Sequence, residues 1–211
     1  MKLEAERSGK KSEFTRRCIG EAVIKLLDRT ELENLRISEI ARVAGVSRTT
    51  FYQYYTTPYS VLVDYLNIIV SEYLAANEAQ ELSGTYFNRE HIIFSFRYFD
   101  RYAEFFHTLV VNRLHSIAFS AINDFMTKHV RAEKPVSVYR LYAYAGALLN
   151  SFLQWIEDGR RESVEDIAEA LQVFVLLRRA CFTTEVTEST TGSERSRYVQ
   201  RNAKNETGPD A

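Results

Sequence analysis

Residues 36–55 read RISEIARVAGVSRTTFYQYY, and this stretch decides how the first part of the chain folds. Four apolar side chains in its first half recur at helical spacing: Ile37, Ile40, Ala41 and Ala44. This spacing predicts a short helix, which Gly45 ends because glycine readily adopts the left-handed conformation of a helix C-terminus. Ser47 is a favourable N-cap residue, so a second short helix is expected to begin at about Arg48. The stretch therefore predicts two short helices joined by a tight turn.

The expected second helix has two different faces. Phe51 and Tyr55 form an apolar edge that would be buried. The other side chains are mostly uncharged hydrogen-bonding groups, and they would face outward: Arg48, Thr49, Thr50, Tyr52 and Gln53. This arrangement is typical of the helix-turn-helix, which places its second helix in the DNA major groove. The same spacing also fits a helical hairpin inside any all-α domain.

The segment 44–55, AGVSRTTFYQYY, resembles the recognition element of TetR-family transcriptional repressors. In that family a glycine, a valine, a capping serine and an aromatic pair recur in this order. The resemblance covers about the first sixty residues and implies DNA contacts from the second helix, with Thr49 closest to the base edges. The residues that it assigns to DNA are Arg48, Thr49, Thr50, Tyr52, Gln53 and Tyr54.

Two positions depart from the family pattern. Pro58 stands where many members have a lysine that binds phosphate, and Gln53 stands where they often have a histidine. The resemblance therefore implies a weaker grip on the phosphate backbone than is usual for the family.

The composition of the chain indicates an all-α protein. The 211 residues include only three prolines and eight glycines, so helix breakers are few, and runs of alternating apolar and polar residues are scarce. The most apolar run, residues 61–70, is interrupted by Asp64 and Asn67 and is too short for a membrane span. We therefore expect a soluble, cytoplasmic protein with no membrane partner.

The charge of the chain is unevenly distributed. Residues 1–60 hold eleven Lys or Arg against eight Asp or Glu, whereas residues 61–182 hold twelve against fifteen. A basic first third fits a DNA-facing domain, although chance variation also gives an asymmetry of this size. Lys10, Lys11, Arg16 and Arg17 precede or open the first expected helix, either as a flexible arm that neutralises phosphates or as a solvated tail.

The chain is expected to have three parts. Residues 1–57 form an N-terminal arm and a three-helix DNA-binding head, whose first helix is predicted over residues 12–28. Residues 58–182 form a helical effector-binding and dimerisation body, which Thr57 and Pro58 open as the cap and first residue of a long helix. Residues 183–211 are rich in Thr, Ser, Glu, Arg and Asn and are predicted to be a disordered tail.

Aromatic residues are dense between Phe94 and Phe125. They fit a packed core, and they also fit a pocket for an apolar or planar effector. If the body holds a pocket, six of its residues are predicted to line it: Phe99, Tyr102, Phe106, Phe119, Tyr142 and Trp155.

The last two expected helices, over residues 136–158 and 163–182, are each apolar on two sides. Such helices bury one side within the subunit and the other against a second copy, which predicts a homodimer. Gly146 supports this prediction, since glycine inside a helix costs about 1 kcal/mol relative to alanine and is explained by the close approach of a neighbour. The predicted interface residues are small or apolar: Ala143, Gly146, Ala147, Ala170, Val173 and Leu177.

The C-terminal half carries a second resemblance. Gly146, Trp155 and Gly159, followed by a helix that Ser163 caps, resemble a TetR-like subgroup that includes activators of dihydroxyacetone kinase operons. Together the two resemblances imply a dimeric transcriptional regulator, a repressor of operator DNA that a small effector releases. The alternative is a co-regulator that binds DNA weakly and acts through a partner protein.

An enzyme is not expected from this sequence. It has no Ser-His-Asp order, no glycine-rich phosphate loop and no pair of carboxylates in an apolar stretch. Cys18 and Cys181 lie far apart, and His107 and His115 have no metal-ligand partner four residues on, so we predict neither a metal site nor a cofactor.

Overall fold

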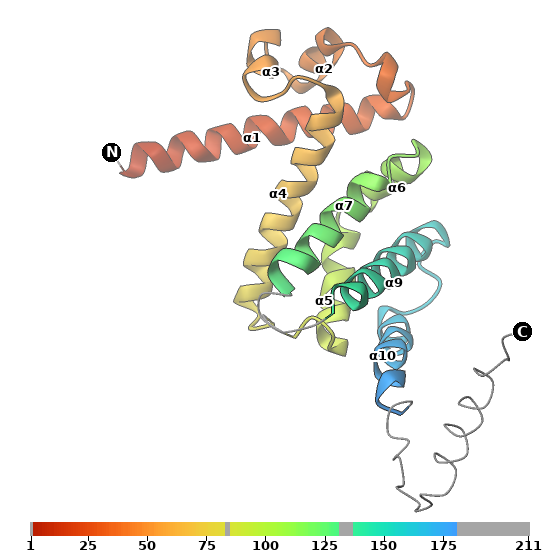
Figure 1. Cartoon of the computed structure of the whole chain (residues 1–211). Coiled ribbons are helices and arrows are strands. Elements are labelled where there is room, and N and C mark those ends of the chain that lie inside the picture. Colours follow the sequence, from red (N-terminus) through yellow and green to blue (C-terminus); the bar gives the residue numbers. More distant parts are fainter. Residues whose placement is uncertain (1, 83–84, 131–136, 181–211) are drawn as a thin grey trace, which may run out of the picture. The chain divides into compact units, whose positions relative to one another are not determined.

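The computed structural model describes residues 2–82, 85–130 and 137–180, and within these ranges every regular element is helical (Figure 1). The fold is therefore all-α, as predicted. The elements are α1 (Lys2–Leu27), η1 (Leu32–Asn34), α2 (Ile37–Ala44), α3 (Arg48–Tyr54), α4 (Pro58–Ala79), α5 (Arg89–Asp100), α6 (Ala103–Val111), α7 (Ser116–Phe125), the π-helical turn η2 (Met126–Val130), α9 (Val138–Glu157) and α10 (Val164–Ala180). The predicted tail, 183–211, lies outside these ranges.

Two compact units divide the chain, residues 1–175 and residues 176–211, and the boundary falls inside α10. Among the residues that the structure describes, no helix is both long and apolar enough to cross a membrane.

The helices α1, α2 and α3 form a small head. α1 packs against α2 and crosses α4, and α2 packs against α3 (Figure 1). The core of the head consists of fully buried apolar side chains: Ile19, Val23, Ile40, Phe51 and Leu62. α1 begins ten residues earlier than predicted, at Lys2, because residues 2–11 contain no proline and are mostly good helix formers.

Arg16 and Arg17 lie inside α1 rather than in a flexible arm. Arg16 donates from Nε and Nη2 to the carboxylate of Asp64 on α4, at 2.8 and 2.9 Å. Arg17 forms ion pairs with Glu72 on α4 and Glu13 one turn earlier. Both arginines therefore hold α1 against α4, and the side chain of Lys10 is outside the described part.

The start of α4 has the predicted cap. Thr57 Oγ1 accepts a hydrogen bond from the backbone N–H of Ser60, Ser60 Oγ accepts one from the N–H of Thr57, and Pro58 occupies the first turn. Further along, α4 passes so close to α1 that a Cβ on Gly20 would lie 2.2 Å from Cδ2 of Tyr65. Only glycine fits this crossing, which fixes the position of α4 under the head.

The rest of α4 belongs to the body. It contacts α7, while α6 and α7 pack on α9. The body core is strongly aromatic and includes Phe96, Phe105, Phe106, Phe152 and Trp155. Ser163 caps α10 by accepting a hydrogen bond from the backbone N–H of Asp166, and its hydroxyl donates to the Asp166 carboxylate. This arrangement differs from a full capping box, in which the carboxylate would accept from the Ser163 backbone.

Candidate nucleic-acid interface and ligand cavity

Local sequence rules set the position of α3. Gly45 adopts φ = 69°, which ends α2, and the N–H of Val46 then bonds to the carbonyl of Ala41 at 2.9 Å. Ser47 caps α3, since its Oγ accepts a hydrogen bond from the backbone N–H of Thr50 at 2.9 Å. Phe51 is fully buried and anchors the helix to the core. The two predicted helices and the turn between them are present.

The opposite face of α3 is exposed. Four side chains lie on it at i, i+1, i+4 and i+5 spacing: Arg48, Thr49, Tyr52 and Gln53. Tyr52 is 52% exposed and Tyr54, on a neighbouring side, is 37% exposed. Thr50 is half-buried, and its hydroxyl lies 2.8 Å from Ser47 Oγ. Thr50 thus takes part in the cap, whereas the other five predicted residues are accessible to a partner.

Asp64 ties the end of α3 to the two long helices. Tyr55, which follows α3, donates its phenol hydrogen to Asp64 Oδ2 at 2.5 Å, and the same carboxylate receives the two hydrogen bonds from Arg16. Burial, together with the hydrogen bond and the negative charge of Asp64, raises the pKa of the Tyr55 phenol above its ordinary value. From the sequence alone, Asp64 was notable only as an interruption of the apolar run 61–70.

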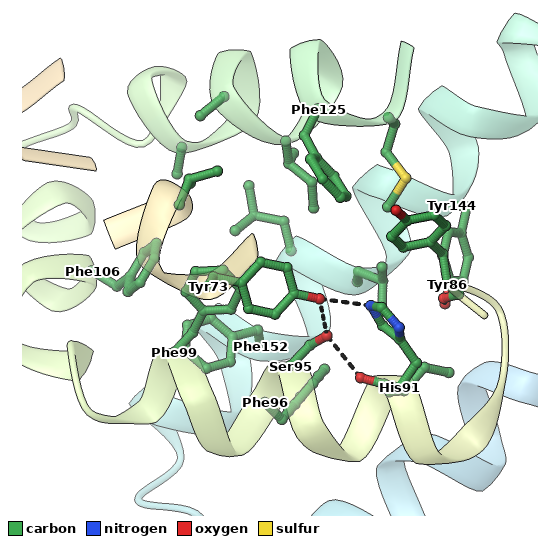
Figure 2. A pocket seen from close by; sticks show the side chains of 18 of the residues that line it. Tyr73, Tyr86, His91, Ser95, Phe96, Phe99, Phe106, Phe125, Tyr144 and Phe152 are labelled. Carbon is green, nitrogen blue, oxygen red and sulfur yellow. Dashed lines mark hydrogen bonds between the residues drawn. The ribbon is translucent and has the colours of Figure 1, made fainter. Parts of the chain in front are cut away.

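The body contains a cavity of about 100 Å³ (Figure 2). Its walls come from α4, α5, α6, α7, η2 and α9, and Tyr86 adds a side chain from the loop before α5. Aromatic rings make up much of the lining: Tyr73, Tyr86, Phe96, Phe99, Phe106, Phe125, Tyr144 and Phe152. None of the lining residues that the structure describes is Asp, Glu, Lys or Arg.

Two of the six predicted effector residues line this cavity, namely Phe99 and Phe106. Phe119 and Trp155 instead line an open groove of about 940 Å³ beside α9 and α10. The Tyr102 hydroxyl donates to Glu72 Oε2 at 3.0 Å, on the outside of α4. Tyr142 is 46% exposed on α9. The structure therefore does not bring the six residues together.

The cavity also holds a polar cluster that sequence reasoning missed. Tyr73 Oη on α4 lies 2.6 Å from His91 Nε2 and 2.8 Å from Ser95 Oγ, and Figure 2 shows these three side chains joined by hydrogen bonds. Burial lowers the pKa of His91, so its imidazole is neutral at pH 7. His91 and Ser95 are four residues apart on α5, a spacing that places them on the same face. This spacing is the one feature of the sequence from which the polar cluster could have been predicted.

The predicted dimer residues on α9 lie at or near its exposed side. Ala143 is exposed, while Gly146 and Ala147 are half-buried, and a Cβ added to Gly146 would meet no atom within 4 Å. Ala170 on α10 is also exposed. The side chains of Val173 and Leu177 lie outside the described residues.

The fold was also compared with known proteins. No protein-family model matches this sequence, and neither does any curated protein. Among solved structures, the dihydroxyacetone kinase operon activator DhaS matches with a TM-score of 0.50 and 19% sequence identity, over 78% of this chain and 95% of that one. At this identity the similarity shows the fold. The chain shares the all-α fold of that operon activator.

Proposed function

We propose that this chain is a dimeric, TetR-like transcription regulator that binds operator DNA through α3 and responds to a small effector in the body cavity. One observation carries the proposal: α3 presents Arg48, Thr49, Tyr52 and Gln53 on one exposed face while Phe51 holds its other face in the core. A short helix anchored in this way is the reading element of a helix-turn-helix. The fold shared with a regulator of operon activity supports the proposal.

The α3 side chains that we propose to contact DNA fall into two chemical groups. Arg48, Thr50 and Tyr52 are assigned to phosphates, because a cation and hydroxyls suit phosphate oxygens and carry no sequence information. Thr49 and Gln53 are assigned to base edges: an amide pairs with adenine N6 and N7, and a threonine methyl meets the thymine methyl. Affinity would then come mainly from the first group and sequence preference from the second.

The experiment that tests DNA binding is a selection of the full chain against a pool of random DNA duplexes. We expect enrichment of a two-fold symmetric site whose half-sites lie about one helical turn, roughly 34–36 Å, apart or a multiple of it, as two heads of a dimer require. Recovery of no preferred sequence at low salt would contradict the proposal.

The second copy is proposed to pack on the exposed side of α9. Tyr139 and Tyr142 are large aromatic side chains with 81% and 46% exposure, and Ala143 and Gly146 leave a shallow strip beside them. Exposed aromatic side chains next to small residues are typical of an interface between subunits. A Cβ added to Gly146 would meet no atom of the described residues within 4 Å, so the proposed second copy, and not a neighbour in the described part of the subunit, accounts for a glycine here.

Gly146→Leu tests this interface, because the variant monomer has room for the new side chain and gains helix propensity of up to about 1 kcal/mol. We expect the leucine to separate the dimer, since overpacking typically costs about 1–3 kcal/mol and the two-fold axis repeats the cost. Gly9→Leu on α1, which also has open space, is the matched control. Light scattering measures the molecular mass, and a dimeric Gly146→Leu protein would contradict the interface.

A chain of contacts suggests how the effector would act on the head. Glu72 on α4 binds Arg17 of α1 and accepts a hydrogen bond from Tyr102 at the start of α6, and its neighbour Tyr73 lines the cavity. An effector that displaces α4 or α6 would therefore also displace α1. In a repressor, such a shift changes the distance between the two heads and releases the operator.

The alternative function is a co-regulator with weak DNA binding of its own. The start of α4 carries Thr57, Pro58, Tyr59 and Ser60, with no basic side chain to hold a phosphate. The solved relative with the same fold is named as an activator. A mobility-shift assay with and without a candidate partner separates the two functions, since the repressor alone shifts its operator.

A further inference from the structure

The body cavity excludes charged ligands by its chemistry. Among the described residues that line it there is no Asp, Glu, Lys or Arg, and the imidazole among them, His91, is neutral at pH 7 because it is buried. A carboxylate or an ammonium in this cavity would lose its hydration without gaining an ion pair, which is strongly unfavourable. The occupant is therefore a neutral molecule.

The size of the cavity sets the size of the molecule. The free volume is about 100 Å³, whereas a dry apolar cavity of about 150 Å³ in another protein binds benzene. A ligand of about six or seven non-hydrogen atoms therefore fits with small movements of the lining. Phe99, Phe125 and Phe152 offer ring edges and faces that suit an aromatic ligand or a short apolar one.

The polar cluster in the wall lacks one hydrogen. Four close contacts join His91 Nδ1 to the Leu82 carbonyl (3.2 Å), His91 Nε2 to Tyr73 Oη (2.6 Å), Tyr73 Oη to Ser95 Oγ (2.8 Å) and Ser95 Oγ to the His91 carbonyl (2.7 Å). A neutral imidazole supplies one N–H and the two hydroxyls supply one hydrogen each, which makes three donors for four contacts. Thr85 does not supply the fourth, because its hydroxyl donates to the Leu82 carbonyl at 2.6 Å.

A cluster with more acceptors than hydrogens accepts a hydrogen bond from a ligand. When Tyr73 donates to His91 and Ser95 donates to the His91 carbonyl, the facing oxygens of Tyr73 and Ser95 have no hydrogen between them. A ligand O–H pointed at either oxygen donates to a lone pair that no hydrogen of the cluster reaches. A ligand that offers only acceptor atoms leaves that lone pair without a donor.

We propose that the effector class of this cavity is a neutral, mainly apolar molecule of about the size of phenol, whose single hydroxyl donates to the Tyr73–His91–Ser95 cluster. Only the regulatory role of the ligand as an effector rests on the proposed function. The binding itself is a property of the free protein and is measured without DNA.

Three probes of similar size test separately whether binding requires a hydrogen-bond donor and whether it excludes charge. Phenol has a ring and a donor, toluene has the same shape without a donor, and benzoate has a charge. Calorimetric titration of the full-length protein is expected to show phenol binding, toluene binding at least about tenfold weaker, and no benzoate binding. Toluene binding equal to phenol, absence of phenol binding, or tighter binding of benzoate or of benzylammonium would overturn the proposal.

Variants locate the hydrogen bond. Tyr73→Phe removes a hydroxyl of the cluster and is expected to reduce the preference for phenol over toluene to less than about threefold; Ser95→Ala is a second, smaller change at the same cluster. Tyr98→Phe is the matched control, since the Tyr98 ring lies 5.3 Å from that of Tyr73 but outside the cavity lining. Circular dichroism confirms that each variant folds.

Retention of the full preference by both cluster variants would overturn the proposed hydrogen bond. Operator binding is measured separately on the same preparation. Intact operator binding without phenol binding refutes only this inference, whereas loss of operator binding by the wild-type protein refutes the proposed function.

Discussion

The α3 surface and the body cavity are built in opposite ways. The exposed face of α3 takes its side chains from one helix of seven residues, Arg48–Tyr54, whose capping and burial are set by its immediate neighbours in the sequence. The cavity takes its lining from six elements between Leu66 on α4 and Phe152 on α9. A surface made by one helix is determined by consecutive residues of the sequence, whereas a cavity depends on how separate helices pack.

The largest effect is expected from loss of the Asp64 carboxylate, which links the end of α3 to α1 and α4. Asp64→Ala leaves Arg16 and the Tyr55 hydroxyl without their acceptor, and both are partly buried. We expect a loss of about 1–3 kcal/mol in the free energy of unfolding and a parallel loss of operator affinity. Urea unfolding measures the first, with Asp28→Ala, an exposed carboxylate after α1, as the control. Equal stability of the two variants would show that the hydrogen bonds of Asp64 with Arg16 and Tyr55 do not stabilise the fold.

The sequence predicted the head better than the cavity. Gly45, Ser47 and Pro58 obey rules that need only a few neighbouring residues, and each occupies its predicted place. For the body, periodicity shows which residues are apolar but not which helix faces which. Tyr142 was predicted to line the effector pocket and is 46% exposed, while His91 received no role and is 3% exposed in the cavity wall.

The next effect concerns the buried phenols of the body. Burial raises the pKa of Tyr98 to about 12, and it also raises the pKa values of Tyr73 and Tyr144. A raised pKa in the folded state means that stability is complete below the unfolded value near 10 and is lost as pH rises above it. We expect the free energy of unfolding to fall between about pH 10 and pH 12.

Urea titrations at several pH values measure this loss. Tyr98→Phe should make it smaller, whereas Tyr139→Phe, at an 81% exposed position, should leave it unchanged. An alkaline loss that is the same in all three proteins would contradict the assignment to buried phenols.

The smallest effect on stability is expected where the two regions meet. Glu72→Gln weakens the contacts with Arg17 and Tyr102, which are partly exposed, and should change the free energy of unfolding by less than about 1 kcal/mol. The reduction in operator affinity caused by a bound ligand should nevertheless become smaller, because the contact between α1, α4 and α6 carries it. Anisotropy titrations with and without phenol measure this coupling. Glu78→Gln, an exposed residue of the same helix, is the control, and unchanged coupling in Glu72→Gln would remove this contact from the account.

The central claim, that the exposed face of α3 reads DNA, is tested most directly by fluorescence-anisotropy titration of Arg48→Ala and Gln53→Ala. Each variant is titrated with the selected duplex and with a scrambled one at several salt concentrations. Arg48→Ala should weaken binding to both duplexes and lower the magnitude of the salt slope by about one unit. Gln53→Ala should lose roughly 1–3 kcal/mol of preference for the selected duplex with little change in the salt slope. Binding by both variants that equals the wild type on both duplexes would contradict the account.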